Sequence, residues 1–247
     1  MIDKTVKMWY AEKNRKEEIT VGELSIIGYM RGDFPTKFGL PRQSGLNDGL
    51  RSHVVMEEAY SVDEAFRGLE GYSHIWILWQ FSEALREDWS PTVRPPRLGG
   101  NTRMGVFATR SPFRPNSIGL SAVKLERIEQ HPQLGPVLHV SGADLMDGTP
   151  IFDIKPYLPY TDSRPEATGG FAAEVFGHAL EVRFAEGIME KLPEEKREAL
   201  IGVLAQDPRP ATQNDPERVY GVPFAGHDVK FIVRDGVLTV TDIVSGE

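Results

Sequence analysis

One segment of the chain gathers positive charge in a pattern that suits an anionic or electron-rich ligand. The segment 89–124 holds no Asp or Glu, although the whole protein has a formal net charge of −8. A guanidinium donates hydrogen bonds in a planar fork that matches carboxylates and phosphates, and it also stacks on flat rings. Prolines and glycines in the segment stiffen the backbone and allow its close approach to a ligand. We therefore expect a rigid cationic wall, whose side chains are Arg94, Arg97, Arg103, Arg110, Arg114 and Lys124.

A carboxamide within this wall is a second candidate for chemistry. Asn116 follows two prolines that bracket Phe113-Arg114, so its side chain leaves a stiff backbone. An amide oxygen can accept the N–H of an exocyclic adenine amine while the nitrogen lone pair attacks an electrophile. Asn after Pro more often stabilises a turn, and the spacing alone favours that role. Both interpretations stay open at this point.

Two further groups of polar residues could contact a ligand. Asp153, Lys155 and Tyr157 alternate along a predicted strand, so an acid, a base and a phenol share one face of the sheet. A solvated strand face has the same pattern, and periodicity does not separate the two. The loop Pro41-Arg42-Gln43 has polar ends and is compatible with cradling a small ligand, although alone it is a weak signal.

Composition excludes several classes of site. The chain has no Cys, which removes disulfides, thiolate chemistry and Cys-based zinc sites. Its six His residues show no metal-ligand spacing, so we expect no metal centre. Nucleotide-binding glycine loops and the Gly-x-Ser-x-Gly elbow are missing from the sequence. The chain has no apolar run of membrane-spanning length and no signal-peptide core at its start, so we expect a cytoplasmic protein without membrane contact.

The elements that must position these residues read mainly as strands. Short apolar runs of strand length, separated by Gly and Pro, predict an antiparallel barrel or sandwich. These runs are 24–30, 52–56, 75–81, 105–109, 121–128, 137–140 and 150–154. One helix is expected to interrupt them, beginning with a capping box at Ser61–Glu64 and ending at Gly71.

The chain is expected to divide into three parts. Residues 1–20 read as a charged extension, 21–165 as the β-barrel, and 166–247 as a small α+β unit. In the last unit, acids at the start and apolar residues on one face predict a helix over 193–206. Two short strands around Asp235-Gly236 predict a hairpin.

Four ordered motifs resemble the TrmO family, also called YaeB or TsaA-like. They are Arg94-Pro95-Pro96-Arg97-Leu98-Gly99-Gly100-Asn101, Gly105–Ser111, Phe113-Arg114-Pro115-Asn116, and Asp147-Gly148-Thr149-Pro150 followed by Asp153–Tyr157. Resemblance runs from about Ile27 to the C-terminal hairpin. It implies an antiparallel β-barrel that methylates N6 of N6-threonylcarbamoyladenosine at position 37 of threonine tRNA. The implied cofactor is S-adenosyl-L-methionine, and the implied assembly is a homodimer that holds the cofactor near its interface.

The resemblance also assigns roles to residues of this chain. It implies cofactor contacts at Pro41, Arg42, Gln43, Ser82, Glu83, Arg110, Leu120, Ser141, Gly142, Ala143 and Asp144. With the residue patterns above, it makes Asn116 and Tyr157 our catalytic candidates. The candidates for contact with the tRNA anticodon loop are Arg94, Arg97, Arg103, Arg114, Asp153 and Lys155. The chain departs from the family at Ser82-Glu83, where His-Gln is common, and at Ser117, where Pro is usual and where we expect a slightly looser loop.

Two other functions fit the same residues. A methyltransferase of the same fold that acts on another adenosine or another RNA would need an identical wall. A barrel that binds the cofactor or RNA as a sensor, without turnover, is the alternative from a different class. A hydrolase is disfavoured because no nucleophile–His–acid pattern occurs.

Overall fold

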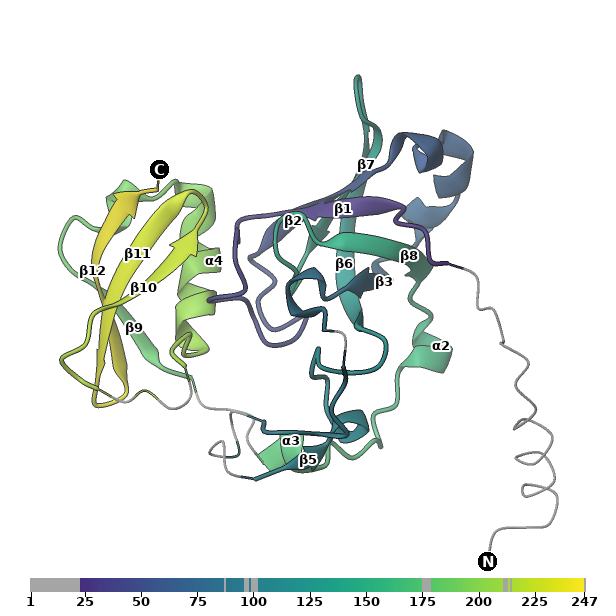
Figure 1. The fold of residues 1–247 in the computed structure, drawn as a ribbon. Coiled ribbons are helices and arrows are strands. Elements are labelled where there is room, and N and C mark those ends of the chain that lie inside the picture. The colour runs from purple at the N-terminus through teal and green to yellow at the C-terminus, as the bar shows by residue number, and fades with distance from the viewer. Residues whose placement is uncertain are drawn as a thin grey trace, which may run out of the picture.

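Six antiparallel strands close a barrel, which confirms the mainly β fold expected from the sequence (Figure 1). The computed structural model describes residues 23–86, 88–95, 98, 102–174, 179–210, 213 and 215–246. The strands pair in the order β1-β2-β7-β6-β3-β8, and β8 pairs with β1 to close the barrel. Their bounds are β1 (Gly28–Arg31), β2 (Arg51–Met56), β3 (His74–Gln80), β6 (Ile118–His131), β7 (Gly135–Ser141) and β8 (Pro150–Pro156).

Period-two burial explains why these segments form the barrel. In β3, the side chains of Ile75, Ile77 and Trp79 are buried and alternate with more exposed neighbours. Successive side chains of a strand point to opposite faces, so this alternation lines the interior with apolar groups. The long strand β6 pairs with β3 through its first half and with β7 through its second half. A register shift between Leu125 and Arg127 marks a bulge in its middle.

A second, smaller sheet and one long helix form the C-terminal part of the fold. The strands pair in the order β10-β11-β12-β9, with β9 parallel to β12. The helix predicted over 193–206 is present as α4 (Glu194–Ala205), which buries Leu200, Val203 and Leu204 in the core of this sheet. Ile201, which the sequence pattern places on the same face as Leu200 and Leu204, is instead 39% exposed. The predicted turn is confirmed at Asp235-Gly236, where both residues have positive φ. The strand bounds are β9 (Glu181–Phe184), β10 (Tyr220–Phe224), β11 (His227–Arg234) and β12 (Val237–Ser245).

Short elements lie in the connections between these strands. The strands β4 (Thr92–Val93) and β5 (Met104–Gly105) form a small hairpin. The remaining short helices are α2 (Pro159–Asp162), α3 (Phe171–Glu174), and the 3-10 turns η1 (Glu58–Tyr60), η2 (Asp63–Phe66), η3 (Leu69–Gly71), η4 (Ser82–Ala84), η6 (Val106–Ala108) and η7 (Met189–Lys191). Among the described residues, none of the helices has the length and apolar character needed to cross a membrane.

The single helix predicted over 61–71 is wrong. The structure has two short 3-10 turns there, η2 and η3, and the chain turns between them at Gly68, whose φ is +88°. Ser61 does not cap a helix, because its hydroxyl donates to the carbonyl of Leu134 at 2.7 Å. The Ser61 hydroxyl that a capping box requires is therefore bonded to a residue distant in sequence.

The strand predicted over 105–109 is also wrong. Only Met104–Gly105 is extended, and the chain then forms η6. The Thr109 hydroxyl closes this turn by donating to the carbonyl of Val106 at 2.9 Å. Val106 is buried whereas Phe107 is 73% exposed. The chain therefore forms a local turn where the apolar run predicts a strand.

Candidate functional site

A cleft of about 650 Å³ collects residues from four distant parts of the chain. Its walls come from the segment between β1 and β2, the end of β3 with η4, the loop before β6 together with the start of that strand, and the segment 144–149. This volume falls within the range of about 300–1,000 Å³ typical of small-molecule sites. Nine residues predicted from the sequence line the cleft, namely Pro41, Arg42, Gln43, Ser82, Glu83, Arg110, Arg114, Leu120 and Asp144.

Two carboxylates, Glu83 and Asp144, line the cleft, and a chain of hydrogen bonds fixes the orientation of Asp144. The indole N–H of Trp79 donates to the Ser121 hydroxyl at 3.0 Å, and that hydroxyl donates to Asp144 Oδ1 at 2.5 Å. Burial raises the pKa of Asp144 above its ordinary value, while the Ser121 hydrogen bond and the charge of Arg110 oppose the rise. The side chain is thus a pre-oriented acceptor beside a cation.

Arg110 connects the cationic wall to the opposite loop. Its guanidinium Nη1 donates to Gln43 Oε1, and Gln43 Nε2 donates to the backbone carbonyl of Arg42. The two groups come from segments 67 residues apart in sequence. This contact joins two residues of the cleft lining, and the charge of Arg110 also acts on the Asp144 carboxylate.

Arg103 and Arg114 of the wall, and Arg86 just before it in sequence, contact neutral partners. Arg114 Nη1 donates to the carbonyl of Thr109 at 3.0 Å, and Arg103 Nη1 donates to the Thr92 hydroxyl at 2.8 Å. Arg86 lies over the ring of Phe113, with 3.8 Å from the guanidinium carbon to the ring centroid. In the described part of the chain, no carboxylate forms an ion pair with Arg86, Arg103, Arg110 or Arg114. Their charge remains available to an anionic ligand.

Ser141, Gly142 and Ala143 lie behind the cleft rather than in its lining. All three residues are buried, so none of them is open to a ligand in the cleft. The Gly142 N–H donates to the Leu50 carbonyl at 3.1 Å, and its carbonyl accepts from the N–H of Gly45 at 2.8 Å. These residues therefore tie the start of β2 and the loop before it to the segment that carries Asp144.

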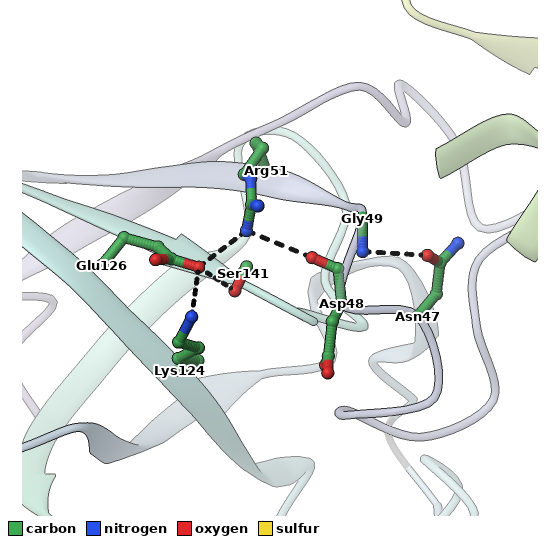
Figure 2. Close-up of polar contacts among 7 residues, drawn as sticks. All are labelled: Asn47, Asp48, Gly49, Arg51, Lys124, Glu126 and Ser141. Carbon is green, nitrogen blue, oxygen red and sulfur yellow. Dashed lines mark hydrogen bonds and ion pairs between the residues drawn. The ribbon is translucent and has the colours of Figure 1, made fainter. Parts of the chain in front are cut away.

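Glu126, in the β6 bulge, strengthens this tie (Figure 2). A bulge re-aims the side chain of its extra residue. Oε1 of Glu126 accepts from the Ser141 hydroxyl at 2.7 Å, from Arg51 Nη1 at 2.7 Å and from Lys124 Nζ at 3.2 Å. Arg51 also donates to the carbonyl of Asp48 at 3.1 Å. The hydrogen bond from Ser141, with the charges of Lys124 and Arg51, holds the pKa of Glu126 below its ordinary value.

Several predicted residues do not reach the cleft. Asn116 is exposed in the turn between the lining residues Arg114 and Ile118. The Ser117 hydroxyl donates to the carbonyl of Pro112 at 3.3 Å, so the serine bridges this turn where we expected it to loosen the loop. Arg94 and Arg103 also lie outside the lining, and Arg97 falls outside the described residues.

The predicted strand face of β8 is present, but it lies away from the cleft. Lys155 Nζ forms an ion pair with Asp153 Oδ2 at 2.7 Å, as expected for residues that share a face. Tyr157 packs against the Trp76 ring, with 5.5 Å between ring centroids, and its N–H donates to the His74 carbonyl. None of Asp153, Lys155 and Tyr157 lines the cleft.

Other lining residues escaped the sequence analysis. Lys37, Gln80 and Arg86 contribute polar groups to the cleft, and Trp79, Phe81 and Leu85 contribute apolar surface. Arg86 lies three residues before the acid-free segment, and Glu87 and Asp88 between them exclude it from a run without acids. No local sequence pattern marks Ser121, because its role depends on hydrogen bonds to Trp79 and Asp144, which are distant in sequence. The described residues contain no cluster of three or more His, Asp or Glu placed to hold a metal ion.

Fold and cleft together define a β-barrel with a small-molecule site rimmed by arginines. Two family models match the chain: the tRNA-methyltransferase O N-terminal domain over residues 29–163, and the TrmO C-terminal domain over residues 177–246. The chain belongs to the TrmO family, which confirms the resemblance found in its sequence.

Individual proteins resemble the chain over most of its length. It is 43% identical to a tRNA (adenine(37)-N6)-methyltransferase of Escherichia coli, over 85% of this chain and 92% of that protein. It is 42% identical to a Pseudomonas aeruginosa protein, provisionally named an S-adenosylmethionine-dependent methyltransferase, RcsF, over 91% of this chain and 98% of that one. The crystal structure of TrmO from P. aeruginosa superposes with a TM-score of 0.76 at 35% identity, covering 94% of this chain and 100% of that one.

Proposed function

We propose that this protein is an S-adenosyl-L-methionine-dependent methyltransferase that modifies N6 of the adenosine at position 37 of tRNA. The observation that carries the proposal is the oriented Asp144 carboxylate beside Arg110 in a cleft of suitable size. The E. coli relative, named for this reaction, spans nearly the same length. We propose further that the acceptor is N6-threonylcarbamoyladenosine in threonine tRNA.

The chemistry of the cleft suits the cofactor. The amino-acid end of S-adenosyl-L-methionine is a zwitterion, and Asp144 and Arg110 offer a carboxylate and a guanidinium to its two charges. Apolar groups of Leu40, Phe81 and Leu120 line the same space and suit the flat adenine ring. When bound, the cofactor supplies an electrophilic methyl group on a sulfonium. Such a transfer depends mainly on alignment of the acceptor nitrogen, which is the task of the protein.

Asn116 and the wall arginines would face the RNA. The exposed carboxamide of Asn116 stands between two lining residues, where its oxygen accepts the N6–H and orients the nitrogen lone pair. Arg94, Arg97, Arg103 and Arg114 hold anticodon-loop phosphates or the threonyl carboxylate, an attraction that salt weakens. Tyr157, Asp153 and Lys155 remain candidates for contacts away from the cleft, on the outer face of β8.

We also propose a cytoplasmic homodimer, with the barrel unit spanning 21–165 and the C-terminal unit 166–247. Leu120 and Ile118 line the cleft and are 52% and 36% exposed. Apolar side chains at the mouth of a cleft are suited to being covered by a second subunit. Light scattering of the purified protein tests the dimer directly.

Single-turnover methyl transfer tests the function. Labelled S-adenosyl-L-methionine is mixed with threonine tRNA that carries or lacks the threonylcarbamoyl group, and the same tRNA with guanosine at position 37 is the control. Transfer to the modified tRNA alone establishes the full proposal. Transfer to the unmodified tRNA as well retains adenosine-37 methylation but removes the specificity. Cofactor binding without transfer to any of these tRNAs favours a sensor or another RNA substrate.

A further inference from the structure

The segment between β1 and β2 supplies one wall of the cleft, yet it packs into the core of the C-terminal sheet. Its residues Pro41, Arg42 and Gln43 line the cleft. Phe34 and Leu50, near the two ends of the segment, are each 3% exposed and belong to the hydrophobic cluster of α4 and β10–β12. The rings of Phe34 and Phe224 meet edge to face, 5.3 Å apart. Figure 1 shows α4 between the C-terminal sheet and this segment.

One face of α4 carries the polar contacts to the segment. Lys196 Nζ pairs with Asp33 Oδ2 at 2.7 Å, and the carbonyl of Ala199 accepts from Asn47 Nδ2 at 2.8 Å. One and two turns further along the same face are Gly202 and Gln206, and Gln206 Nε2 donates to the carbonyl of Leu46 at 3.4 Å. Residues three or four apart lie above one another on a helix, so the contacts form one continuous stripe.

Asn47 is the centre of this stripe. Its side chain is buried, and its Oδ1 accepts from the N–H of Gly49 at 3.1 Å. A Cβ on Gly202 would lie 2.6 Å from Asn47 Nδ2, closer than real Cβ atoms approach. The carboxamide of Asn47 can therefore lie against α4 because residue 202 is a glycine.

The same segment is bound to the barrel next to Asp144. Gly45 and Leu50 exchange backbone hydrogen bonds with Gly142, two residues before Asp144. Figure 2 shows the Asn47–Gly49 turn joined to β2 and, through Arg51 and Glu126, to the end of β7. The segment that carries Asn47 is therefore bonded both to α4 and to the barrel beside Asp144.

The contacts extend to a charge in the cleft itself. Burial raises the pKa of Asp207, just after α4, but hydrogen bonds and charge from Arg209, with a smaller effect from Arg42, hold it below its ordinary value. Arg42 is a cleft-lining residue. Its charge thus lies within electrostatic reach of the end of α4.

We propose that α4 is a positioning element for the cofactor: through Asn47, which fits against Gly202, it holds the 41–46 loop in its cofactor-binding conformation. Asn47 and Gly202 are positioning residues, since neither lines the cleft. This inference rests on the proposed use of S-adenosyl-L-methionine, and it gives the C-terminal unit a role in cofactor affinity.

Gly202→Ala separates this role from simple helix stability. Ala is the better helix former, so a local effect alone would raise the stability of α4 and leave cofactor affinity unchanged. We expect instead that the Kd for S-adenosyl-L-methionine, measured by calorimetry on the full chain, rises about five- to tenfold, the usual net effect of one lost hydrogen bond. We expect kcat at saturating cofactor to stay within about twofold, because the reacting groups remain in place.

A double-mutant cycle completes the test. Asn47→Ala is expected to weaken binding to a similar extent, and Asn47→Ala/Gly202→Ala should bind no more weakly than Asn47→Ala, because the colliding amide is gone. Ile201→Ala is the matched control, since that side chain is 39% exposed on α4, and it should bind like wild type. Circular dichroism verifies that each variant is folded.

The outcomes separate the two proposals. Wild-type affinity in folded Gly202→Ala and Asn47→Ala overturns the positioning role but leaves the cofactor assignment intact. Additive losses in the double variant overturn the Asn47–Gly202 fit. A wild-type protein that does not bind S-adenosyl-L-methionine overturns the proposed function and this inference with it.

Discussion

Replacing Glu126 by alanine tests the junction that holds the two halves of the cleft together. One carboxylate oxygen accepts from Ser141, Arg51 and Lys124, which come from three neighbouring strands. Ser141 is 1% exposed, so its hydroxyl cannot turn to water when the partner is removed. The two cations are about half exposed and recover most of their hydration.

The expected loss of unfolding free energy for Glu126→Ala is about 2 kcal/mol at neutral pH. A buried hydroxyl that loses a charged acceptor costs about 1.5 kcal/mol. The two exposed cations add about 0.5 kcal/mol together, because solvent screens such pairs. Glu126→Gln keeps an oxygen acceptor for Ser141 and should lose about half as much.

The pH dependence of this loss has a definite sign. The pKa of Glu126 in the folded protein lies below its ordinary value of 4.5, so folding favours the ionised form. The stabilisation by its charge is complete above that ordinary value and is lost as the pH falls through the folded pKa. The gap between wild type and Glu126→Gln should therefore be constant from pH 7 to about 5 and shrink below pH 4.5.

Urea denaturation followed by circular dichroism, repeated across this pH range, measures the gap. Arg127→Ala is the control, because its ion pair with Glu129 lies on the exposed surface and its loss should leave the stability close to that of wild type. A Glu126→Ala protein as stable as wild type at pH 7 would refute the assignment of Glu126 as a structural junction. A gap that widens on acidification would refute the pKa direction.

Three further perturbations follow from other parts of the structure. Gly119→Ala places a Cβ 2.2 Å from the Trp79 ring, so the free energy of unfolding measured in urea should fall by about 3 kcal/mol. Gly105→Ala is the control, because a Cβ at Gly105 meets no atom within 4 Å and the variant should be as stable as wild type. Lys196→Met leaves the Asp33 carboxylate, 14% exposed, without its cation and should cost about 2 kcal/mol; equal stability of variant and wild type would contradict this. Burial raises the pKa of Asp144, so the affinity for S-adenosyl-L-methionine should begin to fall at a higher pH than it would with an ordinary aspartate. Calorimetry of Asp144→Asn should show weak binding that does not change over the same pH range.

The local patterns of the chain were enough to predict the barrel strands, the long helix and the C-terminal hairpin, but not β9, β10 or the short helices. Short apolar runs separated by Gly and Pro predicted the barrel strands, and the 193–206 pattern and Asp235-Gly236 predicted α4 and the C-terminal hairpin. Such signals succeed because side-chain period and turn chemistry are set by neighbours in sequence. The helix expected over 61–71 failed because Ser61 bonds to Leu134, a partner that no local window contains.

The types of the cleft residues were also readable, since the acid-free run of arginines and the family motifs lie in continuous sequence. The sequence did not show which of these residues come together in the folded protein. Only packing decides that Ser121 orients Asp144, that Arg110 reaches Gln43, and that Asn116 and Tyr157 stand outside the cleft. The segment between β1 and β2 shows the difference most clearly. Its residue types predict a ligand-binding loop, but its place in the C-terminal core depends on burial against α4. The Asn47–Ala199 hydrogen bond, for example, joins residues 152 positions apart in the sequence. Sequence by itself determined which groups are present and which elements carry them, whereas the closest approach of distant elements determined which groups act together.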